Sequence, residues 1–249
     1  MSGYTVIGSY VSPYVRKVLA CLELKGLDYA IDPIAPFLGN AAFERLSPLR
    51  RVPVLLDGAR VFNDSSVICQ YLEDRHPTPA LYPGDVAERA QARWLEEYAD
   101  TRLADALAWK LFYQRALRPR ITGEPPDEAV VAQALTVDIP AALDYLESQL
   151  PADGFAFGEV SIADLSVASF FRTAAFVDYA IDAARWPRSA ALVARTLALP
   201  ALQKLARYEA CQLGMRAAEQ RAALQAAGAT LTPTTLGDGP LRAMQGHRI

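Results

Sequence analysis

The chain has 249 residues, of which 52% are hydrophobic, and a formal net charge of −3 at pH 7. This length suffices for one or two domains with sizeable cores, and the apolar content excludes a disordered chain. No excess of basic residues is present to neutralise a phosphate backbone, so we expect no nucleic-acid partner.

The three cysteines, Cys21, Cys69 and Cys211, lie far apart in the sequence. Their spacing excludes a disulfide scaffold and any CxxC redox or zinc motif, so we predict no metal and a reducing compartment. The first 25 residues lack a basic start followed by a long apolar core, and no apolar run reaches 18 residues without a charge. We therefore expect no signal peptide, no membrane span and a cytoplasmic location.

The first 76 residues alternate between strand and helix patterns. Apolar or alternating runs predict strands over 4–7, 28–34, 52–56 and 60–62, and helical periodicity predicts helices over 12–25, 40–46 and 64–75. Asp57-Gly58 marks a tight hairpin between the last two strands, which makes them antiparallel, while a helical crossover makes the first pair parallel. The order β-α-β-α-β-β-α therefore predicts a small mixed sheet with helices packed on it.

A proline-rich segment, 77–88, separates this region from a part of the chain with only helical patterns. Periodicity predicts helices over 88–117, 128–150, 163–177, 188–199, 201–213 and 215–227, and residues 228–249 are rich in Gly, Thr and Pro. We predict a first domain over 1–80, a linker over 81–88 and an all-helical domain over 89–215. A partly mobile C-terminal extension covers 216–249.

Two polar residues stand where helices of the first region begin. Ser12 precedes Pro13 and is positioned as an N-cap, and Asp64 occupies the same position before the helix over 64–75. A helix N-terminus carries a partial positive charge and exposed amides, so either residue is a cap alone or also part of an anion site. Ser161 and Asp164 have the spacing of a capping box, which we interpret as structural only.

Pro53 opens the predicted third strand, directly after Val52. Proline in a sheet is confined to edges or first residues. An ordinary edge proline is one interpretation. If the Val52–Pro53 bond is cis, the Val52 backbone turns outward and offers its N–H and C=O to a ligand, as an added strand would.

In this order and spacing, the motifs resemble the soluble glutathione transferases over residues 3–210. The matching stretches are residues 12–18, Val52-Pro53, Asp64-Ser65 and residues 161–164. The resemblance implies an α/β thioredoxin-like N-terminal domain, followed by an all-α helical-bundle C-terminal domain. It also implies a homodimer and a role in detoxification, without assigning a class. The Ser-Ser-Cys signature of the zeta-like isomerases is absent, because Pro13 and Tyr14 follow Ser12.

The resemblance implies a role for each matching position. Ser12 would contact the glutathione sulfur, and Val52, with Pro53 cis, would pair with the cysteinyl backbone. Asp64 and Ser65 would bind the γ-glutamyl end, and Arg51 would lie near the glycyl carboxylate. Tyr10 is an alternative contact for the sulfur.

Glutathione would act as co-substrate, its thiolate attacking a small hydrophobic electrophile. A helix N-terminus and one hydroxyl donor lower a thiol pKa to between about 3.5 and 7.5. Aromatic residues are candidates for the electrophile pocket or, equally, for core or dimer contacts: Tyr10, Tyr14, Phe37, Trp109, Phe112 and Tyr113. Two alternatives stay open: a glutathione-dependent peroxidase, dehalogenase or isomerase, and a non-catalytic module of the same fold that binds a protein.

Overall fold

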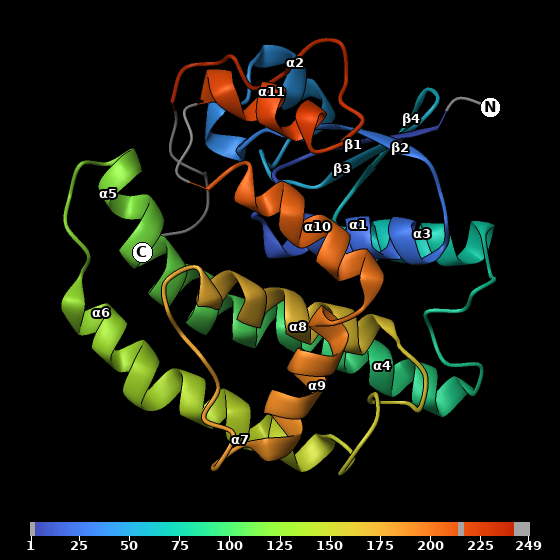
Figure 1. The fold of residues 1–249 in the computed structure, drawn as a ribbon, viewed down its shortest axis with the longest axis vertical. Helices are drawn as coiled ribbons and strands as arrows, with labels where there is room; N and C mark the ends of the chain where they lie inside the picture. Colours follow the sequence, from blue (N-terminus) through green and yellow to red (C-terminus); the bar gives the residue numbers. More distant parts are fainter. Residues whose placement is uncertain (1–2, 214–216, 242–249) are drawn as a thin grey trace. The chain divides into compact units, whose positions relative to one another are not determined.

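The computed structural model describes residues 3–213 and 217–241 and divides the chain into two compact units (Figure 1). The first unit combines the N-terminal residues up to Pro79 with the described residues from Pro200 onward. The second unit is Ala80–Leu199. The chain therefore leaves the first unit after Pro79 and returns to it at Pro200.

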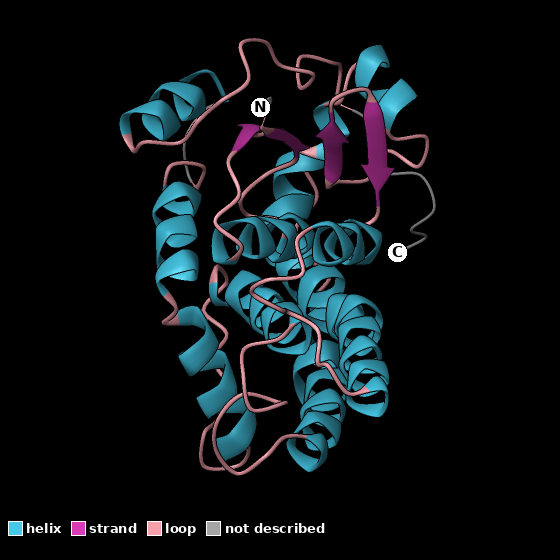
Figure 2. Cartoon of the chain, turned by 90° about the vertical axis from the view of Figure 1, so that its right-hand side faces the viewer, coloured by secondary structure: helices cyan, strands magenta, loops and turns pink. Residues whose placement is uncertain are grey.

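The first unit contains a four-stranded mixed sheet, drawn in magenta in Figure 2. Its strands are β1 (Tyr4–Ile7), β2 (Tyr29–Asp32), β3 (Val54–Asp57) and β4 (Arg60–Asn63), in the order β2-β1-β3-β4. β1 and β2 are parallel, whereas β3 is antiparallel to both β1 and β4. The predicted order and strand directions are confirmed. Strand β3 begins at Val54 rather than Val52, because Pro53 has no amide to donate to the ladder.

Four helical segments of the N-terminal region accompany this sheet: α1 (Pro13–Leu24), η1 (Pro36–Leu38), α2 (Ala41–Leu46) and α3 (Ser65–Arg75). The predicted apolar stripe of α1 is fully buried, at Val15, Val18, Leu19 and Leu22. Gly26 follows the last turn of α1 with φ +64°, a left-handed conformation that favours glycine and ends the helix. Side chains from β1, α2 and β3 meet in a core cluster of Ile7, Ile34, Phe43 and Val54.

The C-terminal segment packs on this N-terminal part. Helix α10 (Pro200–Ala210) lies against α1, and α11 (Ala217–Ala226) follows it (Figure 1). Residue Leu231 then pairs in parallel with Ile31 of β2, with hydrogen bonds of 2.9 and 3.0 Å on its two sides. Farther on, Leu236 packs on the core cluster. The part of the predicted extension over 217–241 is thus anchored along the outer edge of the sheet, while 216 and 242–249 lie outside the described residues.

The second unit is built of helices, as predicted. They are α4 (Val86–Tyr98), η2 (Ala99–Leu117), α5 (Arg118–Ile121), α6 (Glu128–Gln133), η3 (Ala134–Asp138), α7 (Ile139–Gln149), α8 (Ile162–Ala175) and α9 (Pro187–Leu197). Helix α8 is buried almost all round and packs on α4, η2 and α9. The predicted Ser161–Asp164 capping box is present at its start. Helix α5 extends into the predicted loop because Pro119 is tolerated in a first turn.

By length and composition, the stretch Glu128–Gln149 is apolar enough to cross a membrane, with mean hydropathy 1.3. Core helices of soluble proteins have the same property, and 39% of this window is buried inside the protein. Asp138 within it forms ion pairs with Arg102 at 3.3 Å and Lys110 at 3.0 Å. The stretch is therefore tied to its neighbours in the helical unit by charged contacts.

Candidate functional site

Three loops leave the sheet of the first unit at one end. Ile7, the last residue of β1, is paired with Val54, the first residue of β3. Val54 is in turn paired with Asn63, the last residue of β4. The loop before α1, the loop before β3 and the start of α3 therefore meet at this end of the sheet. The register brings together the predicted site residues of all three loops.

Ser12 is the N-cap of α1, as predicted. Its Oγ accepts a hydrogen bond from the Val15 amide at 3.4 Å, and its carbonyl accepts from the Arg16 amide. Accepting this bond leaves the hydroxyl proton of Ser12 available to another acceptor. Partial positive charge at the start of α1 favours an anion at the same place. The half-buried Ser12 side chain thus combines a donor with a helix N-terminus.

Gly8 makes the close approach of these loops possible, which the sequence analysis did not identify. Its φ of +152° lies in the region that favours glycine. A Cβ at this position would lie 2.5 Å from Val15 Cγ2 and 3.2 Å from Val52 Cβ. The loop before α1 therefore passes so close to α1 and to Val52 that a side chain at residue 8 has no room.

The Val52–Pro53 peptide bond is cis. Just before it, Arg50 has a left-handed φ of 52°, and both the amide and the carbonyl of Arg51 bond to Ser47 Oγ, at 2.9 and 2.8 Å. Among residues 3–213 and 217–241, no hydrogen bond engages the Val52 amide or carbonyl. The Val52 backbone therefore offers both groups to a ligand, and the exposed Arg51 side chain lies next to it in the chain.

Asp64 caps α3 from an unusual backbone conformation, with φ 75° and ψ 131°. One carboxylate oxygen accepts from the amides of Ser66 at 3.0 Å and Val67 at 3.2 Å. The Asp64 side chain is exposed, whereas Ser65 is buried. Lys17 Nζ donates to Ser66 Oγ at 3.0 Å, which links the N-terminal halves of α1 and α3.

Tyr10 turns its ring toward the opposite end of α1. The ring is tilted against Tyr208, with 5.1 Å between centroids. It lines a cavity of about 220 Å³ together with residues from the end of α1, the start of β2, α10 and the chain after α11: Glu23, Gly26, Leu27, Asp28, Tyr29, Lys204, Tyr208, Gly228, Ala229 and Thr230. Burial raises the pKa of the Tyr10 phenol, with a smaller contribution from Tyr208, so this hydroxyl stays protonated at neutral pH.

The other aromatic candidates fall into both units. Tyr14 and Phe37 are half-buried in the first unit. In the second unit, the Trp109 and Tyr113 rings lie 6.0 Å apart, and Phe112 packs against Phe176 at 6.1 Å. Phe112 is buried, whereas Trp109, Tyr113 and Phe176 are half-buried. The described residues contain no group of three or more His, Cys, Asp or Glu side chains that would hold a metal ion.

Comparison with known proteins identifies the architecture. Residues 6–80 match the family model of the glutathione S-transferase N-terminal domain. Glutathione S-transferase Z2 of Arabidopsis thaliana is 33% identical over 196 residues, which cover 77% of this chain and 85% of the relative. The chain belongs to the glutathione S-transferase family. All three loops of the site lie within the matched N-terminal domain of this transferase.

Two solved structures extend the likeness to the helical unit. A glutathione S-transferase of Methylobacterium radiotolerans, solved in complex with glutathione sulfonate, is 28% identical with a TM-score of 0.67, and the match covers 81% of this chain and 93% of that one. A bacterial maleyl pyruvate isomerase, described as a Zeta-class glutathione S-transferase, is 26% identical with a TM-score of 0.68. That match covers 82% of this transferase and 97% of the isomerase.

Proposed function

We propose that this glutathione S-transferase binds glutathione at the open end of its sheet and activates the thiol at the N-terminus of α1. One observation carries this proposal: the β1–β3–β4 register brings the Ser12 hydroxyl, the unpaired Val52 backbone and the Asp64 carboxylate to the same place. Glutathione is a tripeptide whose ammonium group suits the carboxylate, whose central peptide unit suits the unpaired backbone, and whose thiol suits the hydroxyl.

Each part of glutathione has a partner in this proposal. The Val52 N–H and C=O pair with the cysteinyl backbone, as a strand does with an added strand. Asp64 holds the γ-glutamyl ammonium, and Ser65, at the N-terminus of α3, holds the γ-glutamyl carboxylate. Arg51 lies near the glycyl carboxylate. The left-handed Asp64 backbone supports a binding role, because strained conformations of this kind concentrate at ligand sites.

The chemical step begins with the loss of the thiol proton to water. The thiolate then forms a carbon–sulfur bond with the electrophile, which either expels a leaving group with its bonding electrons or, at an activated double bond, takes up a proton on the neighbouring carbon. A free cysteine thiol has a pKa of about 8.5. Lowering this pKa by about two units requires about 2.7 kcal/mol of preferential stabilisation of the thiolate. One charge-assisted hydrogen bond from Ser12 supplies about 1.5–3 kcal/mol, and the α1 dipole adds to it. We prefer Ser12 over Tyr10 because the Tyr10 ring lines the cavity at the far end of α1.

We further propose a small hydrophobic electrophile as the second substrate and a cytoplasmic location. We also propose a homodimer, and light scattering tests this by measuring whether the mass is that of two chains. Tyr14, Phe37, Trp109, Phe112 and Tyr113 remain candidates for the electrophile pocket. Transferase activity consumes glutathione, because the new carbon–sulfur bond persists in the product.

A second candidate activity is glutathione-dependent isomerisation. Its support is the likeness to the maleyl pyruvate isomerase and to the Arabidopsis relative named Z2. In an isomerisation the thiolate adds to the substrate and leaves again, so the free thiol concentration is unchanged at the end. Measuring free thiol alongside product therefore separates the two activities.

The role of Ser12 is tested by titrating the ultraviolet absorbance of the bound thiolate against pH in the wild type and in Ser12→Ala. We expect the thiol pKa to rise by about one to two units and turnover at neutral pH to fall about tenfold or more. Glutathione affinity should change little, because the contacts on the other loops remain. An unchanged titration curve would reduce Ser12 to a helix cap.

A further inference from the structure

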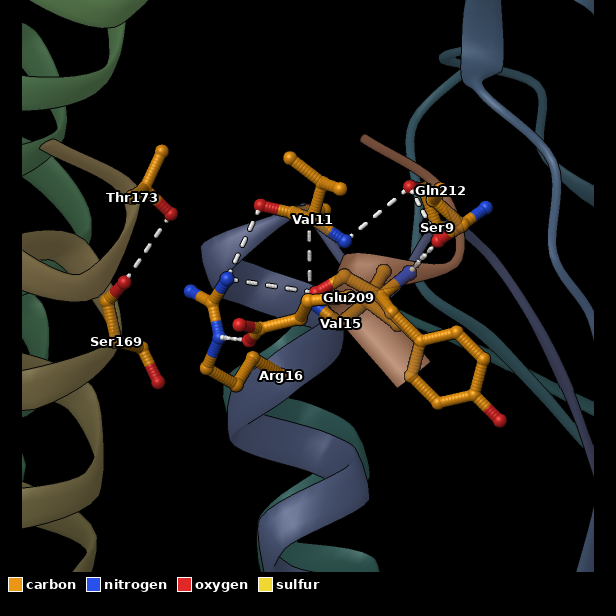
Figure 3. A network of polar contacts seen from close by, with 10 residues as sticks. Ser9, Val11, Val15, Arg16, Ser169, Thr173, Glu209 and Gln212 are labelled. Atoms are coloured by element: carbon orange, nitrogen blue, oxygen red, sulfur yellow. Dashed lines mark hydrogen bonds and ion pairs between the residues drawn. The ribbon is translucent and has the colours of Figure 1, made fainter. Parts of the chain in front are cut away.

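The loop that leads into Ser12 is held by a side chain from the far end of the sequence. Gln212 Oε1 accepts hydrogen bonds from the Tyr10 amide at 2.7 Å and from Ser9 Oγ at 3.1 Å. Gln212 Nε2 donates to the Pro33 carbonyl at 3.1 Å, directly after β2. One buried amide group therefore joins the loop before α1 to the loop after β2. Figure 3 shows the bond between Gln212 and Ser9 in the loop before α1.

Arg16 holds the carbonyl groups of the same loop. Its Nη2 donates to the Val11 carbonyl at 3.3 Å and to the Tyr10 carbonyl at 3.4 Å. Its Nε donates to Glu209 Oε1 at 2.5 Å, and both side chains are only 1% exposed. Figure 3 shows the guanidinium facing both the Glu209 carboxylate and the loop. Glu209 thereby fixes the orientation of the group that binds the loop.

Glu209 and Gln212 act from the same turn of the chain. Glu209 is near the end of α10, and the Gln212 amide donates to the Glu209 carbonyl at 2.9 Å. Inside the loop, the Val11 amide bonds to Ser9 Oγ at 3.2 Å and the Ser12 amide bonds to the Ser9 carbonyl at 3.1 Å. Ser9 therefore links Gln212 to the Ser12 backbone in two steps. The position of Ser12 depends on this chain of contacts.

We propose that Gln212, with Glu209 acting through Arg16, is a positioning residue for the Ser12 hydroxyl. The inference rests on the proposed function, in which Ser12 donates to the glutathione thiolate. Both residues lie outside the matched family domain, which ends at residue 80. The α10 end of this chain thereby sets the geometry of a site whose binding residues all lie before residue 66.

The test substitutes Gln212→Met, which keeps the length of the side chain and removes its hydrogen bonds. We expect the pKa of the bound thiol to rise by about one unit, so that turnover at neutral pH falls about tenfold. The Kd for glutathione should stay within about twofold, because Val52, Asp64 and Ser65 are on other loops. Gln203→Met is the matched control, since Gln203 is exposed on α10, the helix that precedes Gln212, and it should titrate as the wild type.

The double variant Ser12→Ala/Gln212→Met decides how Gln212 acts. If Gln212 works only through Ser12, the Gln212→Met substitution should cause no further rise in the thiol pKa when Ser12 is already alanine. The effects of the two substitutions are then not additive. An equal shift in both backgrounds would overturn the proposal, and so would a wild-type curve for Gln212→Met. If Ser12→Ala alone leaves the curve unchanged, the proposed role of Ser12 fails and this inference fails with it. The Ser12→Ala variant therefore shows whether a failure lies in the proposed role of Ser12 or in the positioning role of Gln212.

Two further variants keep the test decisive if Gln212→Met does not fold. Ser9→Ala removes one of the two loop contacts of Gln212 at a half-buried position, and we expect a smaller shift in the same direction. Gln212→Glu keeps the acceptor oxygens for Tyr10 and Ser9 but loses the donor to the Pro33 carbonyl and buries a negative charge near the N-terminus of α1, so we expect the thiol pKa to rise in this variant as well. A wild-type curve for Ser9→Ala would contradict the positioning role.

Discussion

Asp64 occupies a positive-φ backbone conformation, φ 75° and ψ 131°, that residues other than glycine seldom adopt. Left-handed conformations of this kind cost about 1–3 kcal/mol and persist where the surrounding structure imposes them. One of its carboxylate oxygens caps the amides of Ser66 and Val67. The Asp64 carboxylate is therefore a cap for α3 and, in the proposed function, also the partner of a cationic ligand group.

The two uses are separable by Asp64→Asn. Asparagine caps as well as aspartate and has nearly the same shape, so the backbone strain is the same in both and the free energy of unfolding should change by less than about 0.5 kcal/mol. Loss of the charge should weaken glutathione binding by about 1.5–3 kcal/mol. Calorimetric titration with glutathione and urea unfolding measure the two effects. Unchanged affinity would show that Asp64 is only a cap, and Asp64→Ala, which removes the cap too, should lose stability by about 1 kcal/mol.

At the scale of elements, a buried carboxylate of β2 contacts the described part of the C-terminal segment, in addition to the backbone pairing of Leu231 with Ile31. Asp32, 2% exposed, accepts hydrogen bonds from Arg221 Nη1 at 3.1 Å and from the Leu236 amide at 2.6 Å. Burial raises the pKa of Asp32 above its ordinary 3.8, and the contacts with Leu236, Thr235 and Arg221 oppose this rise. A raised pKa means that Asp32 binds its proton more tightly in the folded protein than in the unfolded chain. The stability gained from this proton binding is therefore lost as the pH rises through the pKa of Asp32.

We predict that Arg221→Met destabilises the protein mainly when Asp32 is ionised. At about pH 7 the loss should be about 1.5–3 kcal/mol, because a buried carboxylate then lacks its cationic partner. Toward lower pH the loss should shrink, because the Asp32 carboxyl takes up a proton as the pH falls through its raised pKa. Urea unfolding at several pH values measures this difference. In Asp32→Asn the same Arg221 substitution should show no such pH dependence, and a constant loss in the wild-type background would contradict the assignment.

This segment also shows where sequence reasoning stops. Ser12, Asp64 and the Ser161–Asp164 box were predictable as caps because capping depends on residues two or three positions apart. The hairpin at Asp57-Gly58 was equally local. The Leu231–Ile31 pairing and the Gln212–Tyr10 hydrogen bond join residues about 200 positions apart. The chain after residue 228 has only turn-forming composition, so nothing in it predicts the pairing of Leu231. Gln212 lies at the end of the helix predicted over 201–213, and helical periodicity does not say which distant loop its side chain contacts.

At the scale of the whole molecule, the helical unit is an insertion in the first unit, between Pro79 and Pro200. If this insert of about 120 residues unfolds, α10 and the segment after it are tethered to the sheet only by a long flexible loop. Closing such a loop costs on the order of 4 kcal/mol of chain entropy. Unfolding of the second unit therefore destabilises the first one, although the proposed glutathione site lies in the first unit alone.

This coupling predicts how glutathione protects the protein. All three tryptophans, Trp94, Trp109 and Trp186, lie in the second unit, so their fluorescence reports its unfolding, whereas circular dichroism reports both units. At a concentration about one hundred times its Kd, glutathione should add about 2.7 kcal/mol to the free energy of unfolding. We expect both signals to shift together to higher denaturant concentration, since the loop cost links the units. Movement of the dichroism signal alone would contradict the coupling, and movement of neither signal would contradict glutathione binding.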